Sequence, residues 1–307
     1  MAVRVAEEWL GICAGCEVSI LDIGDELLDL LPSLEFVHIP VLADHKYFGQ
    51  KGERHDGFEI PEADVGIVSG CVRNDENKAI ALAMRKSCKT LISLGSCAAF
   101  GGIPALANLS TREDLLDKVF RGSKTTLSSD TPRENIPPLL DRVYALSEVV
   151  KPDLMIPGCP PDSGMIAQAL TSLLEGKPFK LPDKSVCDEC PTKREKKSGS
   201  RLKRPLEPMA QTPLGDTRCF MEQGYLCLGP ATRAGCAGSR PGPRCVLSYM
   251  PCRGCFGPVK EGSNPMVDMM TALSSIGLDA KDIPDRAATM NRYTGGQGRL
   301  RALPARK

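Results

Sequence analysis

The sequence predicts an α/β protein in which a parallel sheet, covered by helices on both faces, is followed by a loop-rich part. Short apolar runs typical of strands alternate with helical patterns over the first 176 residues, which favours a parallel sheet. Residues 180–262 instead contain many Pro, Gly and Cys and almost no periodicity. The third observation is the presence of 14 cysteines in a chain of 307 residues, a number that calls for a chemical role.

Strands are predicted where short apolar runs end close to Gly or Pro. The runs DVGIVSG and KTLISLG are the clearest, because both are short, apolar and followed by a helical pattern or a cysteine motif. The predicted strands cover residues 3–10, 35–42, 64–70, 89–95 and 153–157.

Helices are predicted where apolar residues recur every three or four positions. Ser110 with Glu113 forms a capping-box pattern, and Asp162 is a suitable N-cap for the helix that precedes Gly176. A last helix is expected to begin at Pro265, with Met269 and Leu273 in its buried stripe. The other predicted helices cover residues 18–31, 76–87, 111–120, 137–150 and 163–175.

The composition excludes several classes of function. Lys and Arg number 39 against 38 for Asp and Glu, so the net charge of +1 gives no bulk attraction for nucleic acid, and aromatic residues are scarce at 5%. No apolar run reaches the roughly 18 residues of a membrane span. The N-terminal residues lack a signal-peptide pattern, so we expect a cytoplasmic protein whose reduced thiols bind metal. The basic run at 193–204 is predicted to be a solvated loop.

Five cysteines of the first part follow predicted strands. Cys13 and Cys16 come after the first strand, and Cys71, Cys97 and Cys159 each come after a later one. Because ligands of an open parallel sheet lie outside the carboxyl ends of its strands, we expect these thiols at one edge of the sheet. Four thiolates around an iron–sulfur cluster fit this placement best. The fifth cysteine, Cys71, is then a neighbouring sulfur or an alternative ligand.

Two other interpretations of this group stay open. A Cys-x-x-Cys between a strand and a helix is typical of a thioredoxin-type redox site, although that interpretation leaves Cys97 and Cys159 unexplained. A zinc site is the second, although zinc ligands usually come as two pairs on one small knuckle. Cys88, near a helix end, is predicted to be a small buried hydrophobe.

Eight further cysteines lie between residues 187 and 255. Two close pairs flank the group, Cys187 with Cys190 and Cys252 with Cys255. Eight thiolates suffice for two four-iron clusters or for two zinc knuckles, so their number alone does not decide. Bound metal would supply the folding free energy that this part lacks in apolar surface. The four cysteines between the pairs are Cys219, Cys227, Cys236 and Cys245.

Several motifs around the cysteines form a recognisable combination. They are CAGCE at 13–17, GSCAAFGG at 95–102 and GCPPD at 158–162, and together they resemble the small subunits of NiFe hydrogenases. GPATRAGC at 229–236 and MPCRGCFGP at 250–258 narrow the resemblance to the gamma subunits of methyl-viologen-reducing hydrogenases. Those cytoplasmic enzymes do not reduce the deazaflavin coenzyme and associate with heterodisulfide reductase. The resemblance extends to about residue 280.

The resemblance implies three 4Fe-4S clusters in two domains. A flavodoxin-like domain at 1–178 would hold the proximal cluster, and an iron–sulfur domain at 179–307, with its C-terminal helix, would hold the medial and distal clusters. Cys187 replaces a histidine of the periplasmic members, and Cys245 replaces a proline, which implies a medial 4Fe-4S cluster of lower potential. The implied ligands are Cys13, Cys16, Cys97 and Cys159 (proximal), Cys236, Cys245, Cys252 and Cys255 (medial), and Cys187, Cys190, Cys219 and Cys227 (distal).

The resemblance also implies an oxidoreductase subunit that transfers electrons from H2 oxidation. No catalytic residue is assigned to this chain, because the nickel–iron site of the family lies in a large subunit. The other implied partners are an iron–sulfur delta-type subunit and a flavin-containing heterodisulfide reductase, in the electron bifurcation of methanogenesis. Two alternatives stay open: the small subunit of another cytosolic hydrogenase or complex I-like oxidoreductase, and a zinc-stabilised interaction protein.

Overall fold

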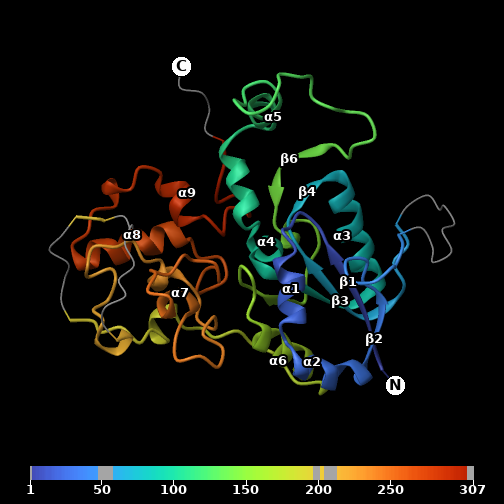
Figure 1. Cartoon of the computed structure of the whole chain (residues 1–307), viewed down its shortest axis with the longest axis horizontal. Helices are drawn as coiled ribbons and strands as arrows, with labels where there is room; N and C mark the ends of the chain where they lie inside the picture. The colour runs from blue at the N-terminus through green and yellow to red at the C-terminus, as the bar shows by residue number, and fades with distance from the viewer. Residues whose placement is uncertain (1, 48–57, 196–200, 204–212, 303–307) are drawn as a thin grey trace.

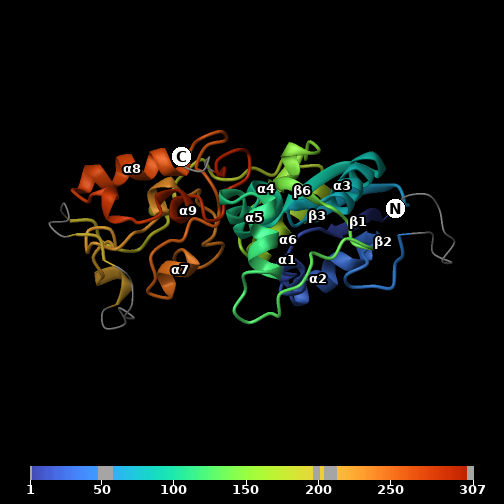
Figure 2. The same cartoon turned by 90° about the horizontal axis from the view of Figure 1, so that it is seen from above.

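The computed structural model describes residues 2–47, 58–195, 201–203 and 213–302. Figure 1 shows a sheet with its helices, coloured blue to yellow-green, beside a part built from loops and short helices, coloured yellow to red. Figure 2 shows the same two parts side by side along the longest axis. The α/β fold class predicted from the sequence is confirmed. Within the described ranges, no helix combines the length and the apolar character needed to cross a bilayer.

The elements alternate over the first part of the chain. The strands are β1 (Val3–Trp9), β2 (Leu34–His38), β3 (Ala63–Ser69), β4 (Val72–Asn74), β5 (Cys88–Leu94), β6 (Leu139–Tyr144) and β7 (Leu154–Ile156). The α-helices are α1 (Gly15–Leu21), α2 (Asp25–Leu30), α3 (Asp75–Ser87), α4 (Gly95–Phe100), α5 (Arg112–Phe120), α6 (Ser163–Leu174), α7 (Arg244–Leu247), α8 (Pro265–Ile276) and α9 (Arg286–Met290).

The central sheet has five parallel strands in the order β2-β1-β3-β5-β7. Strands β4 and β6 do not belong to this sheet, because they pair with each other in a separate antiparallel ladder. The five parallel strands therefore have the strand order of flavodoxin-like folds. Each of these strands is followed by a helix or a long crossover, which is the connection that parallel neighbours require. All carboxyl ends therefore meet at one edge, where the cysteine motifs follow β1, β3, β5 and β7.

Helices cover both faces of the sheet because successive strand residues point to opposite sides. Val5 of β1 belongs to the same apolar cluster as Ile20 of α1 and Ile166 of α6. The next residue, Ala6, belongs to a second cluster with Met84 of α3. The first of these clusters continues into the loop-rich part, where Phe256 and other buried residues extend it.

The helix predicted at 137–150 is wrong, because this segment forms β6 and a short 3-10 turn. β6 pairs antiparallel with β4, with Val72 opposite Tyr144. The Asn108 side chain also exchanges hydrogen bonds with the backbone of Val143, at 2.8 and 2.9 Å. These partners are distant in sequence, so they override a local periodicity that is compatible with a helix.

The helix predicted at 18–31 is divided at Gly24, which has a φ of +72°. A left-handed residue cannot continue an α-helix, so α1 ends before it and α2 begins after it in a new direction. As a result, Leu28 of α2 is 65% exposed, whereas Ile20 of α1 is buried.

In α6 and α8 the side chain before the helix accepts a hydrogen bond from a backbone N–H of the first turn. Asp162 caps α6 by accepting a hydrogen bond from the Met165 N–H at 3.2 Å, and Asn264 accepts from the Met266 N–H at 3.0 Å. The capping box predicted at Ser110 is wrong by one residue. Thr111 is the N-cap of α5, and its hydroxyl accepts from the Asp114 N–H at 3.1 Å.

The loop-rich part returns to the sheet near its end. Met269 and Leu273 of α8 are fully buried, as predicted. Beyond α9, Thr294 forms a bridge with Gly102, and the Gly296 N–H donates to the carbonyl of Phe100 at 2.8 Å. The last described segment is therefore fixed against the end of α4, beside the cysteine motif of that helix.

Candidate metal centres

The thiols that follow the parallel strands gather at the carboxyl edge of the sheet. Cys16 lies in the first turn of α1, Cys97 lies in α4, and Cys159 follows β7. Burial, followed by the charges of Glu17, Cys97, Cys159 and Cys13, raises the pKa of Cys16 far above its usual value. Burial and then Cys71, Cys159 and Cys13 raise the pKa of Cys97 to about 12. The four cysteines of the predicted proximal set are therefore neighbours.

Two glycines keep the space beside these sulfurs free of side chains. A Cβ atom on Gly95 would collide with the sulfur of Cys16, and one on Gly102 would lie 2.5 Å from the sulfur of Cys97. Both glycines have positive φ, at +82° and +59°, which a residue with a Cβ rarely adopts. The backbone alone therefore approaches the sulfurs, as a bulky inorganic group at this edge requires.

Cys71 differs from its neighbours because protein atoms already engage its thiol. The thiol is fully buried and donates a hydrogen bond to the carbonyl of Gly11 at 3.2 Å. The two residues also form an isolated backbone bridge. Cys88 is 4% exposed and packs in the apolar cluster on the α3 side of the sheet, as predicted.

A cavity of about 430 Å³ in the loop-rich part is lined by the four thiols of the predicted distal set, Cys187, Cys190, Cys219 and Cys227. Burial raises the pKa of Cys187. The positive charge of Arg194 acts in the opposite direction, and the charges of Cys190 and Cys219 raise the pKa further. Gly229 forms part of the wall, where a Cβ atom would lie 3.2 Å from the Cys187 sulfur and 3.5 Å from the Cys227 sulfur. The cavity is thus kept open beside the thiols.

Arg194 is a residue of this cavity that the sequence reasoning missed. It lines the cavity, and the charge of Cys187, followed by that of Cys219, raises the pKa of its guanidinium. Its position four residues after Cys190 was a possible signal, but the basic run at 193–204 indicated a solvated loop. Of that run, residues 196–200 and 204 lie outside the described residues.

The four thiols of the predicted medial set lie together between the other two groups. Burial, followed by the charges of Cys245 and Cys236, raises the pKa of Cys255 to about 12. Burial and then Cys227 and Cys255 raise the pKa of Cys252 well above its usual value. Cys252 is therefore close both to a thiol of its own group and to one of the distal group.

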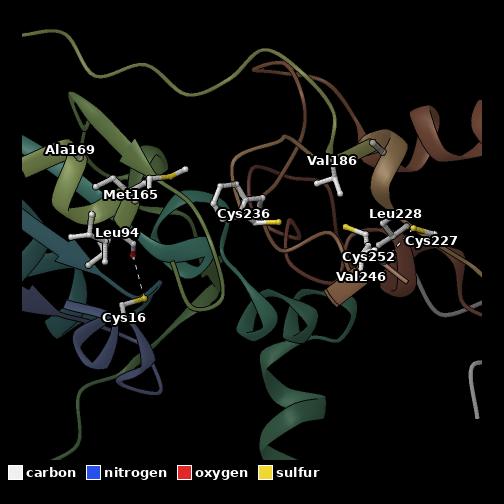
Figure 3. Packing of buried hydrophobic residues seen from close by; sticks show 14 of the residues in the cluster. Cys16, Leu94, Met165, Ala169, Val186, Cys227, Leu228, Cys236, Val246 and Cys252 are labelled. Carbon is white, nitrogen blue, oxygen red and sulfur yellow. Dashed lines mark hydrogen bonds between the residues drawn. The ribbon is translucent and has the colours of Figure 1, made fainter. Parts of the chain in front are cut away.

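Hydrogen bonds join the three groups in series. The hydroxyl of Ser96, next to Cys97 of the first group, donates to the backbone carbonyl of Cys255 in the second. The backbone N–H of Cys252, also in the second, donates to the sulfur of Cys227 in the third at 3.3 Å. Figure 3 shows thiols of all three groups following one another from the sheet into the loop-rich part, with Cys16 near the carbonyl of Leu94.

The donor set fits iron–sulfur clusters better than single metal ions. Across the described ranges, no three His, Cys, Asp or Glu side chains are close enough to hold one metal ion. Four thiolates around a 4Fe-4S core stand farther apart than four ligands of one zinc ion. Buried thiols that raise one another's pKa also resist ionisation until a cationic group is bound among them. Each group of four thiols therefore has the donor chemistry that an iron–sulfur cluster requires.

Comparisons with known proteins identify relatives of this chain among hydrogenases. Residues 13–173 match the family described as NADH ubiquinone oxidoreductase, 20 Kd subunit. The G-type subunit of the vhu F420-non-reducing hydrogenase of Methanocaldococcus jannaschii is 41% identical over 96% of this chain and 95% of its own length. The G-type subunit of the F420-non-reducing hydrogenase of Methanothermobacter thermautotrophicus is 36% identical over 89% of this chain and 84% of its own.

A solved structure gives the same result for the fold. A chain of an NAD+-reducing NiFe hydrogenase in the H2-reduced state superposes with a TM-score of 0.52 and 32% identity, over 59% of this chain and 96% of that chain. The resemblance to NiFe hydrogenase small subunits that the cysteine motifs indicated is thereby confirmed. The chain belongs to the family of G-type subunits of F420-non-reducing hydrogenases, and it is a component of a hydrogenase complex.

Proposed function

We propose that this chain carries electrons through three 4Fe-4S clusters, away from H2 oxidation in the large subunit of a NiFe hydrogenase. The observation that carries the proposal is the succession of three groups of four thiols, joined in series by the hydrogen bonds from Ser96 to Cys255 and from Cys252 to Cys227. A bound cluster supplies one-electron transfer and needs no open coordination position.

In this proposal the chain's own residues hold and insulate the clusters. Cys13, Cys16, Cys97 and Cys159 hold the proximal cluster in a domain at 1–178, and the medial and distal sets hold theirs in a domain at 179–307. Burial of Cys16, Cys252 and Cys227, each less than 10% exposed, keeps water away from the sulfurs along the path. Arg194 places a positive charge beside the distal thiols, which favours the reduced, more negative state there.

The proposed partners follow from the same reasoning. A large subunit supplies the nickel–iron site, and an iron–sulfur delta-type subunit passes electrons to a flavin-containing heterodisulfide reductase in the cytoplasm. The names of the relatives support an acceptor other than coenzyme F420. Enzyme purified with its natural subunits is expected to contain heterodisulfide reductase, and a complex that instead contains NAD-binding subunits would favour another cytosolic hydrogenase.

Iron and acid-labile sulfide analysis of the purified complex tests the cluster assignment. Three 4Fe-4S clusters give about 12 irons and an equal number of sulfides for this chain, after subtraction of the iron of the other subunits. Electron paramagnetic resonance of the reduced complex should then resolve more than one cluster. Two or more zinc ions per chain, with little sulfide, would favour a zinc-stabilised interaction protein instead.

A further inference from the structure

Ser96 joins the loop of the first thiol group to the loop of the second. The side chain is 1% exposed, and its hydroxyl donates a short hydrogen bond to the backbone carbonyl of Cys255. The same hydroxyl accepts from the N–H of Gly158 at 3.2 Å. The Ser96 N–H also donates to the carbonyl of Gly158 at 2.8 Å. One small side chain therefore contacts two segments separated by about a hundred residues.

These contacts connect the segments that carry the first two groups. Gly158 immediately precedes Cys159 of the first group, and Cys255 belongs to the second. The Ser96 hydroxyl thus holds the residue before Cys159 on one side and the backbone of Cys255 on the other. No side chain can replace this contact from Gly158 itself, because a Cβ atom there would lie 2.5 Å from the Cα of Pro161. The Ser96 hydroxyl is therefore a direct polar link between the backbone beside Cys159 and that of Cys255.

We propose that Ser96 is a positioning residue for electron transfer between the first and second cluster, because its hydroxyl holds Gly158 and Cys255 in register. This inference rests on the proposed function. The cluster of the first group loses one electron and that of the second gains it, with no bond made or broken. The step into the third group has a separate hydrogen bond, from the Cys252 N–H to the Cys227 sulfur, that Ser96 does not contact.

The test compares three variants in the complete hydrogenase complex. Ser96→Ala removes both hydrogen bonds of the hydroxyl, and Ser96→Thr keeps them. Ser93→Ala is the matched control, because Ser93 is also buried on the same segment and its hydroxyl has no hydrogen-bond partner in the described part of the chain. The measurements are iron and sulfide content, the magnetic interaction between the first two reduced clusters, and the rate at which H2 reduces the second cluster in freeze-quench experiments.

The Ser96→Ala complex should keep its iron and sulfide. The rate at which H2 reduces its second cluster should be about tenfold lower, because a small misplacement of a positioned group lowers a rate strongly. Its magnetic interaction between the first two clusters should weaken, while Ser96→Thr and Ser93→Ala behave as the unmodified protein. An unchanged rate and interaction in Ser96→Ala would overturn the proposal. Loss of the first cluster in Ser96→Ala would also overturn it, since Ser96 would then build the cluster site itself. Absence of iron–sulfur signals from the unmodified complex would instead refute the proposed function.

Discussion

Cys71 and Cys97 lie close together at the sheet edge, yet their thiols have different surroundings. The Cys71 thiol donates to the Gly11 carbonyl, whereas Cys97 couples electrostatically to Cys71 and then to Cys159 and Cys13, and its charge also acts on Cys16. A cluster needs four thiolates, and Cys71 is the thiol outside the family motifs. The identity of these neighbours, more than burial alone, separates a ligand from a structural cysteine.

We predict that Cys71→Ser keeps the proximal cluster and that Cys97→Ser loses it. A serine at 71 retains a hydroxyl that can donate to Gly11, while a serine at 97 removes one of four thiolates. Electron paramagnetic resonance of the reduced variants measures the proximal signal. The reverse result, with the signal lost in Cys71→Ser and kept in Cys97→Ser, would make the ligand assignment wrong.

Glu7 is a second residue whose surroundings give a measurable effect. It is fully buried in β1, close to the carboxyl groups of Glu17 and Glu8. Burial, followed by the charges of Glu17 and Glu8, raises its pKa from 4.5 to about 9. At pH values between 4.5 and about 9, the Glu7 carboxyl of the folded chain keeps a proton that the unfolded chain releases. Its stability therefore falls as the pH rises from 4.5 toward 9.

Glu7→Gln should remove this pH dependence and stabilise the fold by about 3 kcal/mol at pH 7. The advantage should be small near pH 4.5 and should grow until about pH 9, where the Glu7 carboxyl of the folded chain also ionises. Denaturant midpoints at pH 5, 7 and 9 measure it. Glu35→Gln, at an exposed position of β2, is the control and should show no such growth. A constant difference between Glu7→Gln and the unmodified protein at all three pH values would contradict the argument.

At the scale of elements, the strands of the parallel sheet were predictable and β6 was not. The runs at 64–70 and 89–95 are short, apolar and bounded by glycine, so their local pattern is sufficient. The segment 137–150 has a helical period, but β4 and Asn108 supply its backbone with partners from far along the chain. Such partners leave no signal within the segment, so periodicity alone gives the wrong element.

The cap of α5 shows how a one-residue error can be tested. Thr111→Ala should destabilise the first turn of α5 by about 1 kcal/mol, because the hydroxyl that accepts from Asp114 is lost. Ser110→Ala is the matched control, since Ser110 precedes the cap, and it should have little effect. Amide hydrogen exchange at Asp114 and Leu115 reports the local change. Equal exchange in the two variants would contradict the assignment of Thr111 as the cap.

At the scale of the whole molecule, the positions of the thiols were easier to predict than the contacts between their groups. Cysteines after parallel strands must meet at one sheet edge, so the first group followed from topology. Arg194 and Ser96 were missed because their roles depend on contacts that the fold creates. The Ser96 hydroxyl meets a backbone carbonyl 159 residues further along the chain.

The direction of electron flow gives the last prediction. Cys190 belongs to the third group, farthest along the series from the sheet edge, and lines the 430 Å³ cavity. Cys190→Ala should lose or convert the distal cluster. In the proposed path, H2 splitting lies upstream of that change, in the large subunit, so hydrogen–deuterium exchange activity should remain largely intact. Reduction of the natural acceptor by H2 should fall sharply, because the last step of the path is interrupted.

Cys16→Ala is the matched comparison, because it removes a thiolate at the opposite end of the same series. It interrupts the first step, so viologen dyes should lose their electron supply together with the natural acceptor. Dyes are a weaker readout for Cys190→Ala, since they collect electrons from the medial cluster as well. Both variants are compared only in complexes that retain all their subunits. If Cys190→Ala reduced the natural acceptor at the normal rate, the cavity of Cys187 and Cys190 would not hold the exit cluster, and electrons would leave from the medial group instead.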